Sequence, residues 1–187
     1  MRRVAFLFVL LIACSPPEKE IASTTINMDS LLHAQAKILS GRGIEKSVSV
    51  GDSTFASTKI NTSVNWNDAL EAFRELGQVN RPIYRHAYEQ KETRDSKSNL
   101  MIRTWTAKTN VPVSEIKLYY LPGPKRLKRV EAFINMKDFY FTAHRKMILD
   151  FTLLGELNQL ESYHISGSQK YFWSAEQKFS VNCIVKP

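Results

Sequence analysis

The sequence predicts an α+β fold in which a curved antiparallel sheet of about six or seven strands packs on one main helix, about 66–77, with a short N-terminal helix in addition. Strand-like alternation dominates from Pro82 to the end of the chain, whereas helical spacing of apolar residues is confined to two stretches before it. Short connectors join consecutive strands, so these neighbours must be antiparallel. One apolar and one polar strand face predict helices on a single side of the sheet.

Residues 1–13 have the layout of an export signal. Arg2 and Arg3 precede an unbroken apolar run from Val4 to Ala13, which is too short for a permanent span of about 20 apolar residues. The segment leads into Leu11-Ile12-Ala13-Cys14, which resembles the lipobox of bacterial lipoproteins. That resemblance implies a lipoprotein signal peptide at 1–13 and acylation of the Cys14 thiol. The alternative is an ordinary secretory signal that contains a cysteine.

Residues 14–27 follow as a flexible, proline-bearing tether, and residues 28–187 as a single α+β domain. Because Ser15 rather than aspartate follows Cys14, the lipoprotein resemblance implies the bacterial outer membrane, on either its periplasmic or its surface face. Loss of Arg2 and Arg3 lowers the formal charge from +8 to +6. The remaining basic residues are scattered along the chain, which argues against a nucleic-acid partner.

Two helices are predicted before the strands. The first covers 29–39, with Asp29 or Ser30 as its cap; its polar positions lack the basic face of a membrane-lying helix, which is the alternative. The second is the main helix, capped by Asn65 and ended at Gly77. Its apolar face comprises Trp66, Leu70, Phe73 and Leu76. Between the two, residues 42–63 predict one or two short strands.

The strands of the meander are predicted from alternation and from turn residues. Their ranges are 83–90, 100–107, 114–121, 127–136, 139–151, 160–166 and 178–185. Lys137-Asp138 and Gly167-Ser168 are interpreted as turns, and Phe139 is placed on the inner face of its strand. The aromatic residues exceed what one inner face can hold. Several of them, if gathered on the outer face, would suit sugar stacking or protein docking.

No catalytic or metal-binding pattern emerges from the chain. His33, His86, His144 and His164 lack partners at ligand spacing, and neither a nucleophile elbow nor a phosphate-binding loop is present. We therefore expect no metal, no cofactor and no enzymatic activity. The alternative is a hydrolase assembled from the last three of these histidines. Cys183 alternates with apolar neighbours, which predicts a buried residue rather than a reactive thiol.

A basic cluster is the remaining candidate contact site. Lys125, Arg126, Lys128 and Arg129 follow a Pro-Gly-Pro turn. They could meet lipid head groups, acidic polysaccharide or a partner protein; the alternative is a solvated hairpin tip.

These observations favour a lipid-anchored, non-enzymatic binding or structural lipoprotein of the bacterial envelope, with the membrane as its partner through Cys14. The mature domain also resembles outer-membrane lipoproteins of unknown function, including in the Asn65-Trp66-Asn67-Asp68 helix start before a long meander. That resemblance supplies no activity. The alternative is a periplasmic-facing carrier of a hydrophobic ligand in a half-barrel cavity, by analogy of fold. A void of several hundred cubic ångströms between the main helix and the sheet would favour the carrier.

Overall fold

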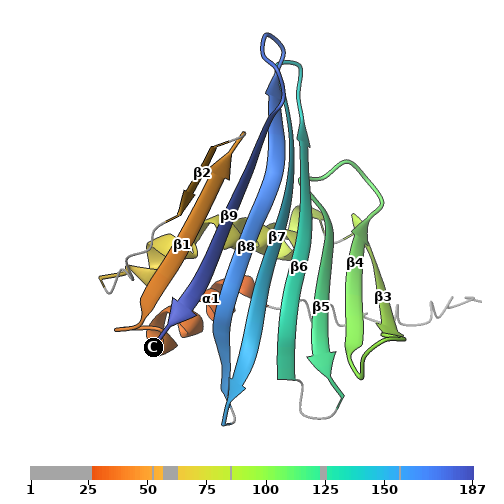
Figure 1. Cartoon of the computed structure of the whole chain (residues 1–187). Helices are drawn as coiled ribbons and strands as arrows, with labels where there is room; N and C mark the ends of the chain where they lie inside the picture. Colours follow the sequence, from red (N-terminus) through yellow and green to blue (C-terminus); the bar gives the residue numbers. More distant parts are fainter. Residues whose placement is uncertain (1–26, 52, 57–62, 85, 123–125, 156) are drawn as a thin grey trace, which may run out of the picture.

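The computed structural model describes residues 27–187 apart from 52, 57–62, 85, 123–125 and 156 (Figure 1). The predicted signal peptide, Cys14 and the tether up to residue 26 lie outside the described residues. So does Lys125 of the basic cluster.

The described strands form one open antiparallel sheet of nine strands, in the order β2-β1-β9-β8-β7-β6-β5-β4-β3 (Figure 1). Their bounds are β1 Gly43–Val50, β2 Ser53–Ala56, β3 Tyr88–Arg94, β4 Met101–Ala107, β5 Val113–Leu121, β6 Arg126–Lys137, β7 Phe141–Leu154, β8 Leu157–Tyr171 and β9 Gln177–Lys186. The antiparallel meander is confirmed, but the predicted six or seven strands are too few. The hairpin β1–β2 joins the sheet beside the last strand, β9, and this long-range pairing leaves no local sequence signal.

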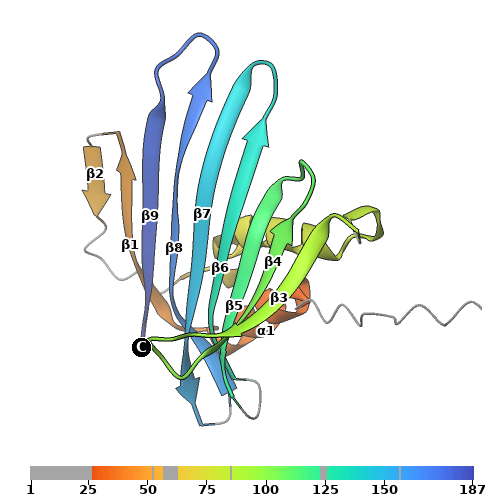
Figure 2. The same ribbon diagram turned by 90° about the vertical axis from the view of Figure 1, so that its right-hand side faces the viewer.

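The topology itself places the helical layer on the sheet. β2 and β3 lie at opposite edges, so the chain between them must cross a face of the sheet. That crossing contains α2 (Trp66–Ala69), η1 (Glu71–Asn80) and η2 (Pro82–Tyr84), and α1 (Met28–Ile38) packs beside it. The helices lie on one side of the sheet, behind it in Figure 1, as predicted (Figure 2).

The prediction of one main α-helix over 66–77 is wrong about the type of helix. Only Trp66–Ala69 is α-helical, and Glu71–Asn80 is a 3-10 helix. Leu70, Phe73, Leu76 and Val79 are all buried and recur every third residue, which matches three residues per turn rather than 3.6. The short N-terminal helix predicted over 29–39 is confirmed as Met28–Ile38, and with 11 residues it is the longest α-helix among the described residues.

Asparagine caps both α-helices. Asn27, not Asp29 or Ser30, caps α1, because its Oδ1 accepts a hydrogen bond from the Ser30 amide at 3.0 Å. Asn65 caps α2 as predicted, accepting from the Asn67 amide at 3.1 Å. Both contacts satisfy amides that the first helical turn leaves without partners.

Three strand boundaries differ from the predictions. The strand predicted to begin at Ile83 begins at Tyr88, after η2. Phe139 lies in the β6–β7 turn and not on an inner face. The predicted turn at Gly167-Ser168 is wrong, since both residues are part of β8 and pair with β7 and β9. The glycine has another reason: a Cβ at Gly167 would lie 2.1 Å from the His144 carbonyl oxygen of β7. Only glycine allows so close an approach of two strands.

The core lies between the helices and the alternating inner residues of the strands. Val130, Ala132 and Ile134 of β6 are buried, as the alternation predicted, and the Phe73 ring of η1 meets the Tyr163 ring of β8 edge to face with centroids 5.5 Å apart. This face therefore holds both helix and strand side chains in direct contact.

The buried side chain of Gln35 fixes α1 on the sheet. Pairing of β8 with β9 ends at Ser162 and Ile184, and β8 then continues past a register shift. There the Gln35 amide group donates to the Asn158 carbonyl at 2.8 Å and accepts from the Leu160 amide at 2.7 Å. The side chain thus replaces a neighbouring strand, and it is only 3% exposed.

Gln35→Leu should lower the free energy of unfolding by about 3 kcal/mol, because it leaves two buried backbone groups without partners. Urea unfolding followed by circular dichroism measures this. His33→Ala, an exposed position of the same helix, is the matched control and should change little. Equal effects of both variants would contradict the role assigned to Gln35.

Two titratable groups meet in the core. Burial, followed by the neighbouring Cys183 thiol, raises the pKa of Tyr163 above its ordinary value. Burial also raises the pKa of Cys183, and the hydrogen bond with Tyr163 offsets this only in part. Cys183 is 2% exposed, as predicted for a structural residue.

A third titratable group, Tyr88, has a raised pKa elsewhere in the fold. Burial raises the pKa of Tyr88 to about 12, and its hydroxyl donates to the Val113 carbonyl at 2.8 Å.

These raised pKa values predict that stability falls at alkaline pH. The unfolded chain releases these protons near the ordinary pKa values, while the folded protein still holds them, so the free energy of unfolding decreases with pH above about pH 9. Each fully buried group contributes a slope of up to about 1.4 kcal/mol per pH unit. Urea unfolding between about pH 8 and pH 11 measures the slope. Tyr163→Phe should make it shallower; an unchanged slope would contradict the assignment.

Candidate functional site

Six aromatic residues gather at one end of the sheet, on two neighbouring hairpin turns. We call them the aromatic tip: Phe139, Tyr140, Phe141, Tyr171, Phe172 and Trp173. The first three lie at the β6–β7 turn and the others at the β8–β9 turn. The turns are adjacent because β7 pairs with β8, with Phe141 opposite Tyr171. Both hairpins rise above the neighbouring strands at the top of the sheet (Figures 1 and 2).

Backbone hydrogen bonds hold the two turns in shape. The Asp138 carboxylate accepts from the Tyr140 and Phe141 amides, at 2.8 and 2.7 Å. In the other turn, the Ser174 amide donates to the Tyr171 carbonyl at 3.1 Å. The Phe172 amide donates to the Tyr140 carbonyl at 2.9 Å, which joins the two hairpins directly. The tip is therefore one structural unit and not two independent loops.

The rings of the tip contact one another yet remain exposed to solvent. Phe139 and Phe172 are stacked with centroids 6.5 Å apart, and Tyr171 and Trp173 with centroids 5.6 Å apart. Phe139 is nevertheless 80% exposed, Phe172 77% and Trp173 71%. Exposed rings in a contiguous group mark an interaction site more often than scattered single residues do.

Lysines surround the tip just below its apex. Lys137 ends β6, Lys170 precedes Tyr171, and Lys178 lies near the start of β9; all three side chains are exposed. Asp138 and Glu176 carry the opposing charge nearby. The formal charge of this collar is therefore weakly positive.

The sequence interpretation missed this site. It considered only the outer sheet face as a place where surplus aromatics could gather, whereas the structure gathers six aromatic residues on the two turns. A signal was present: 139–141 and 171–173 are each three consecutive aromatic residues. Successive strand residues point to opposite faces, so such a triplet cannot fit one buried face. Each triplet also lies beside a turn-forming residue, Asp138 or Ser174.

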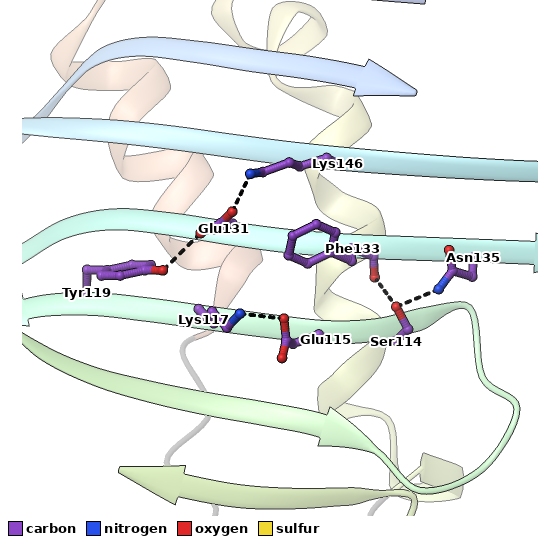
Figure 3. A network of polar contacts seen from close by, with 8 residues as sticks. All are labelled: Ser114, Glu115, Lys117, Tyr119, Glu131, Phe133, Asn135 and Lys146. Atoms are coloured by element: carbon purple, nitrogen blue, oxygen red, sulfur yellow. Dashed lines mark hydrogen bonds and ion pairs between the residues drawn. The ribbon is translucent and has the colours of Figure 1, made fainter. Parts of the chain in front are cut away.

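The outer face of the sheet carries a second feature, a polar network across β5, β6 and β7 (Figure 3). Glu131 is at its centre, bonded to Lys146 at 2.6 Å and to the Tyr119 hydroxyl at 2.9 Å. The Phe133 ring lies between the ammonium groups of Lys117 and Lys146, 5.6 and 5.3 Å from its centroid. Such contacts hold the exposed face of a sheet together.

The electrostatics of this network do not suit proton transfer at neutral pH. Burial alone would raise the pKa of Glu131, but the hydrogen bonds from Lys146 and Tyr119 outweigh it and hold that pKa below its ordinary range. Burial and the bond to Glu131 raise the pKa of Tyr119 to about 12. Both groups thus keep one protonation state near pH 7, whereas a general acid or base needs a pKa near the working pH.

The histidines remain apart in the structure. His33 and His86 are exposed on separate elements, His144 contacts Asn135 at 2.7 Å, and His164 contacts Asn182. Across the described part of the chain, no three His, Cys, Asp or Glu side chains lie close enough to hold a metal ion. Among the contacts of the described residues, none joins any two of His86, His144 and His164, although the alternative hydrolase site requires such a contact.

Two hollows appear on the described surface. One, about 490 Å³, lies beside Asp29, Arg74 and Arg81 at the ends of α1 and η1. The other, about 290 Å³, lies on the outer face beside Phe133, His144, Ser166, Ser168 and Lys178. Neither lies between the helices and the sheet, where Trp66, Leu70, Phe73 and Leu76 belong to the packed core.

The described part of the basic cluster lies at the opposite end of the sheet from the aromatic tip. Arg126 begins β6, which ends beside the tip at Lys137. Arg126 and Lys128 are half-buried, and Arg129 is bonded to Asp150 at 2.6 Å. One of the cluster's charges is thus already paired.

Among the described residues, the structure contains no helix with the length and apolar character that a membrane span requires. Comparison of the chain with protein-family models, with curated proteins and with solved structures found no match.

Proposed function

We propose that this protein is a lipid-anchored, non-enzymatic binding lipoprotein of the bacterial outer membrane, which presents the aromatic tip to a partner. The lipid on Cys14 holds the chain at the membrane. The sheet acts as a rigid support that carries the tip away from the anchored end. The observation that carries the binding role is the exposure of Phe139, Phe172 and Trp173 on bonded turns.

The cost of exposing these rings supports the binding role. Large aromatic side chains contribute most to stability when they are buried, about 1.5–3 kcal/mol for a phenylalanine. A fold that holds several of them in water, on turns fixed by hydrogen bonds, gains little stability from them. Trp, Tyr and Phe are also enriched at protein binding surfaces relative to the rest of a protein surface.

The distances support an anchor at one end and a binding site at the other. Gln35 of α1 contacts β8 at Asn158 and Leu160, and the tip begins at Tyr171. Tyr171 lies thirteen positions after Asn158 along β8, about 43 Å at a rise of about 3.3 Å per residue. The basic residues Arg126 and Lys128 lie at the anchored end, where they could approach lipid head groups.

A binding role fits the described surface better than the alternative carrier role. A carrier needs a cavity for its ligand, and the core side chains of α2 and η1 contact strand side chains directly. The ionisable side chains of the outer face are bonded to one another around Glu131. These contacts favour a rigid support over a ligand chamber or an acid–base site.

Cys14→Ala should abolish incorporation of a labelled fatty acid and release the protein from the membrane fraction, because the acyl chains supply the anchor. Cys183→Ala is the matched control; the label should be retained, since that thiol is buried in the core. Labelling and fractionation of cells expressing each variant measure both effects. Retention of the label by Cys14→Ala would refute the anchor.

Replacement of Phe139, Phe172 and Trp173 by serine should change the free energy of unfolding by less than about 1 kcal/mol, because exposed side chains contribute little to stability. The same variant should bind much less of the hydrophobic dye bis-ANS. Ile83→Ser, exposed to 80% outside the tip, is the control and should keep most of the dye binding. A large loss of stability would show that the rings serve the fold instead.

A further inference from the structure

We infer that the partner of the aromatic tip is a lipid surface, into whose interfacial layer the rings insert. This inference deepens the proposed function and rests on it, because the proposed function gives the tip its binding role.

The size and shape of the tip favour a lipid surface over a protein partner. A stable protein–protein interface takes about 20–30 residues from each side. The tip offers six aromatic residues on two turns that project beyond the rest of the sheet (Figure 2). A narrow projection can enter a deformable lipid layer with a few side chains, without a preformed complementary pocket.

The composition of the tip also matches a membrane interface. Tryptophan and tyrosine concentrate at the level of the lipid head groups, where the ring is apolar and the N–H or O–H remains hydrated. Trp173, Tyr140 and Phe172 belong to the turns of the tip, while Lys137 lies three positions before Tyr140 and Lys170 two positions before Phe172. Lysines in that position can keep their ammonium groups among head groups while the rings enter the apolar layer.

The polar groups of the tip argue against a sugar ligand. Sugar recognition pairs an open ring face with hydrogen-bonding side chains. Here the Asp138 carboxylate is already bonded to two amides of its own turn. The Ser174 hydroxyl accepts from the Tyr171 amide and donates to the Ala175 carbonyl. The Tyr171 and Trp173 rings are stacked on each other, so each already has one face in contact.

The distance between the anchored end and the tip allows two arrangements of the domain: the tip contacts either the bilayer that holds the lipid anchor or a second lipid surface. Twelve residues separate Cys14 from Asn27, and such a segment reaches at most about 45 Å when fully extended. This is close to the distance of about 43 Å between the Asn158 end of β8 and the tip. The tip can therefore reach the bilayer that holds the lipid only if the tether is extended and the domain is turned so that the tip points back toward that bilayer. If the tip points away from that bilayer, it can contact a second lipid surface without such a rearrangement.

Trp173 provides an intrinsic reporter for the test. Of the three tryptophans, Trp66 and Trp105 are 3% and 4% exposed, whereas Trp173 is 71% exposed. Aqueous acrylamide and brominated acyl chains should therefore quench Trp173 selectively. Trp173→Phe gives the baseline, and its remaining emission should respond to neither quencher.

The experiment uses the full lipidated protein in vesicles of phosphatidylethanolamine and phosphatidylglycerol, mixed with a second population of the same composition. Brominated lipid is placed in one population at a time. Quenching of Trp173 from either population, with protection from acrylamide, is the expected result, and the quenching population identifies the bilayer reached. If brominated lipid quenches Trp173 in neither vesicle population, the inference is overturned. Protection from acrylamide by soluble envelope glycan fragments without lipid quenching would also overturn it.

Two further measurements separate the tip from the anchor. Flotation of the variant that carries Phe139→Ser and Phe172→Ser, whose tip should add little to lipid binding, reports the lipid anchor in the first vesicles. Its failure would count against the proposed function and leave the tip test intact. Phe139→Ser combined with Phe172→Ser keeps Trp173 and should weaken the tip's association with lipid about tenfold or more, while Ile83→Ser leaves it unchanged. Equal quenching of Trp173 by brominated lipid in the Phe139→Ser, Phe172→Ser variant and in the Ile83→Ser variant would refute insertion of the tip.

Discussion

The pairing of the Gln35 amide with the unpaired edge of β8 is the interaction on which the arrangement of the fold depends. It holds α1 where β9 no longer covers its neighbour, through bonds at 2.8 and 2.7 Å. α1 in turn packs on α2 and η1, so this buried side chain contributes to the position of the helical layer as well as to that of α1. A glutamine can do this because its amide group carries a donor and an acceptor, as a strand does.

The position of the helical layer divides the sheet into two regions. Below, helix and strand side chains share one packed core around Phe73 and Tyr163. Arg145 of β7 bonds Glu75 of η1 at 3.0 Å and fastens the helices to the sheet from the other side. Above, the long strands β6 to β9 carry the aromatic tip beyond the helices (Figure 1). The sheet thus holds the exposed rings far from the end of β8 on which α1 packs.

Sequence reasoning succeeded where a local pattern decides the structure. Alternation placed Val130, Ala132 and Ile134 on the inner face and Glu131 on the outer, because strand periodicity is a property of consecutive residues. It failed where longer-range contacts decide. The buried residues from Leu70 to Val79 follow a three-residue period that a helix of 3.6 residues per turn only approximates. Gly167 suggested a turn, but the close approach of β7 explains it better.

The sequence by itself determined the antiparallel meander, the division of the strands into an apolar and a polar face, and the motif at Cys14 from which the anchor is proposed. Each follows from neighbours in the chain. Only the tertiary structure decided that β1 joins β9, that Gln35 completes β8 and that two aromatic triplets share one tip. Residues 139–141 and 171–173 are brought together by the register of β7 with β8. A strand register is fixed by the packing of the whole sheet, so neither triplet could reveal the other from its own sequence.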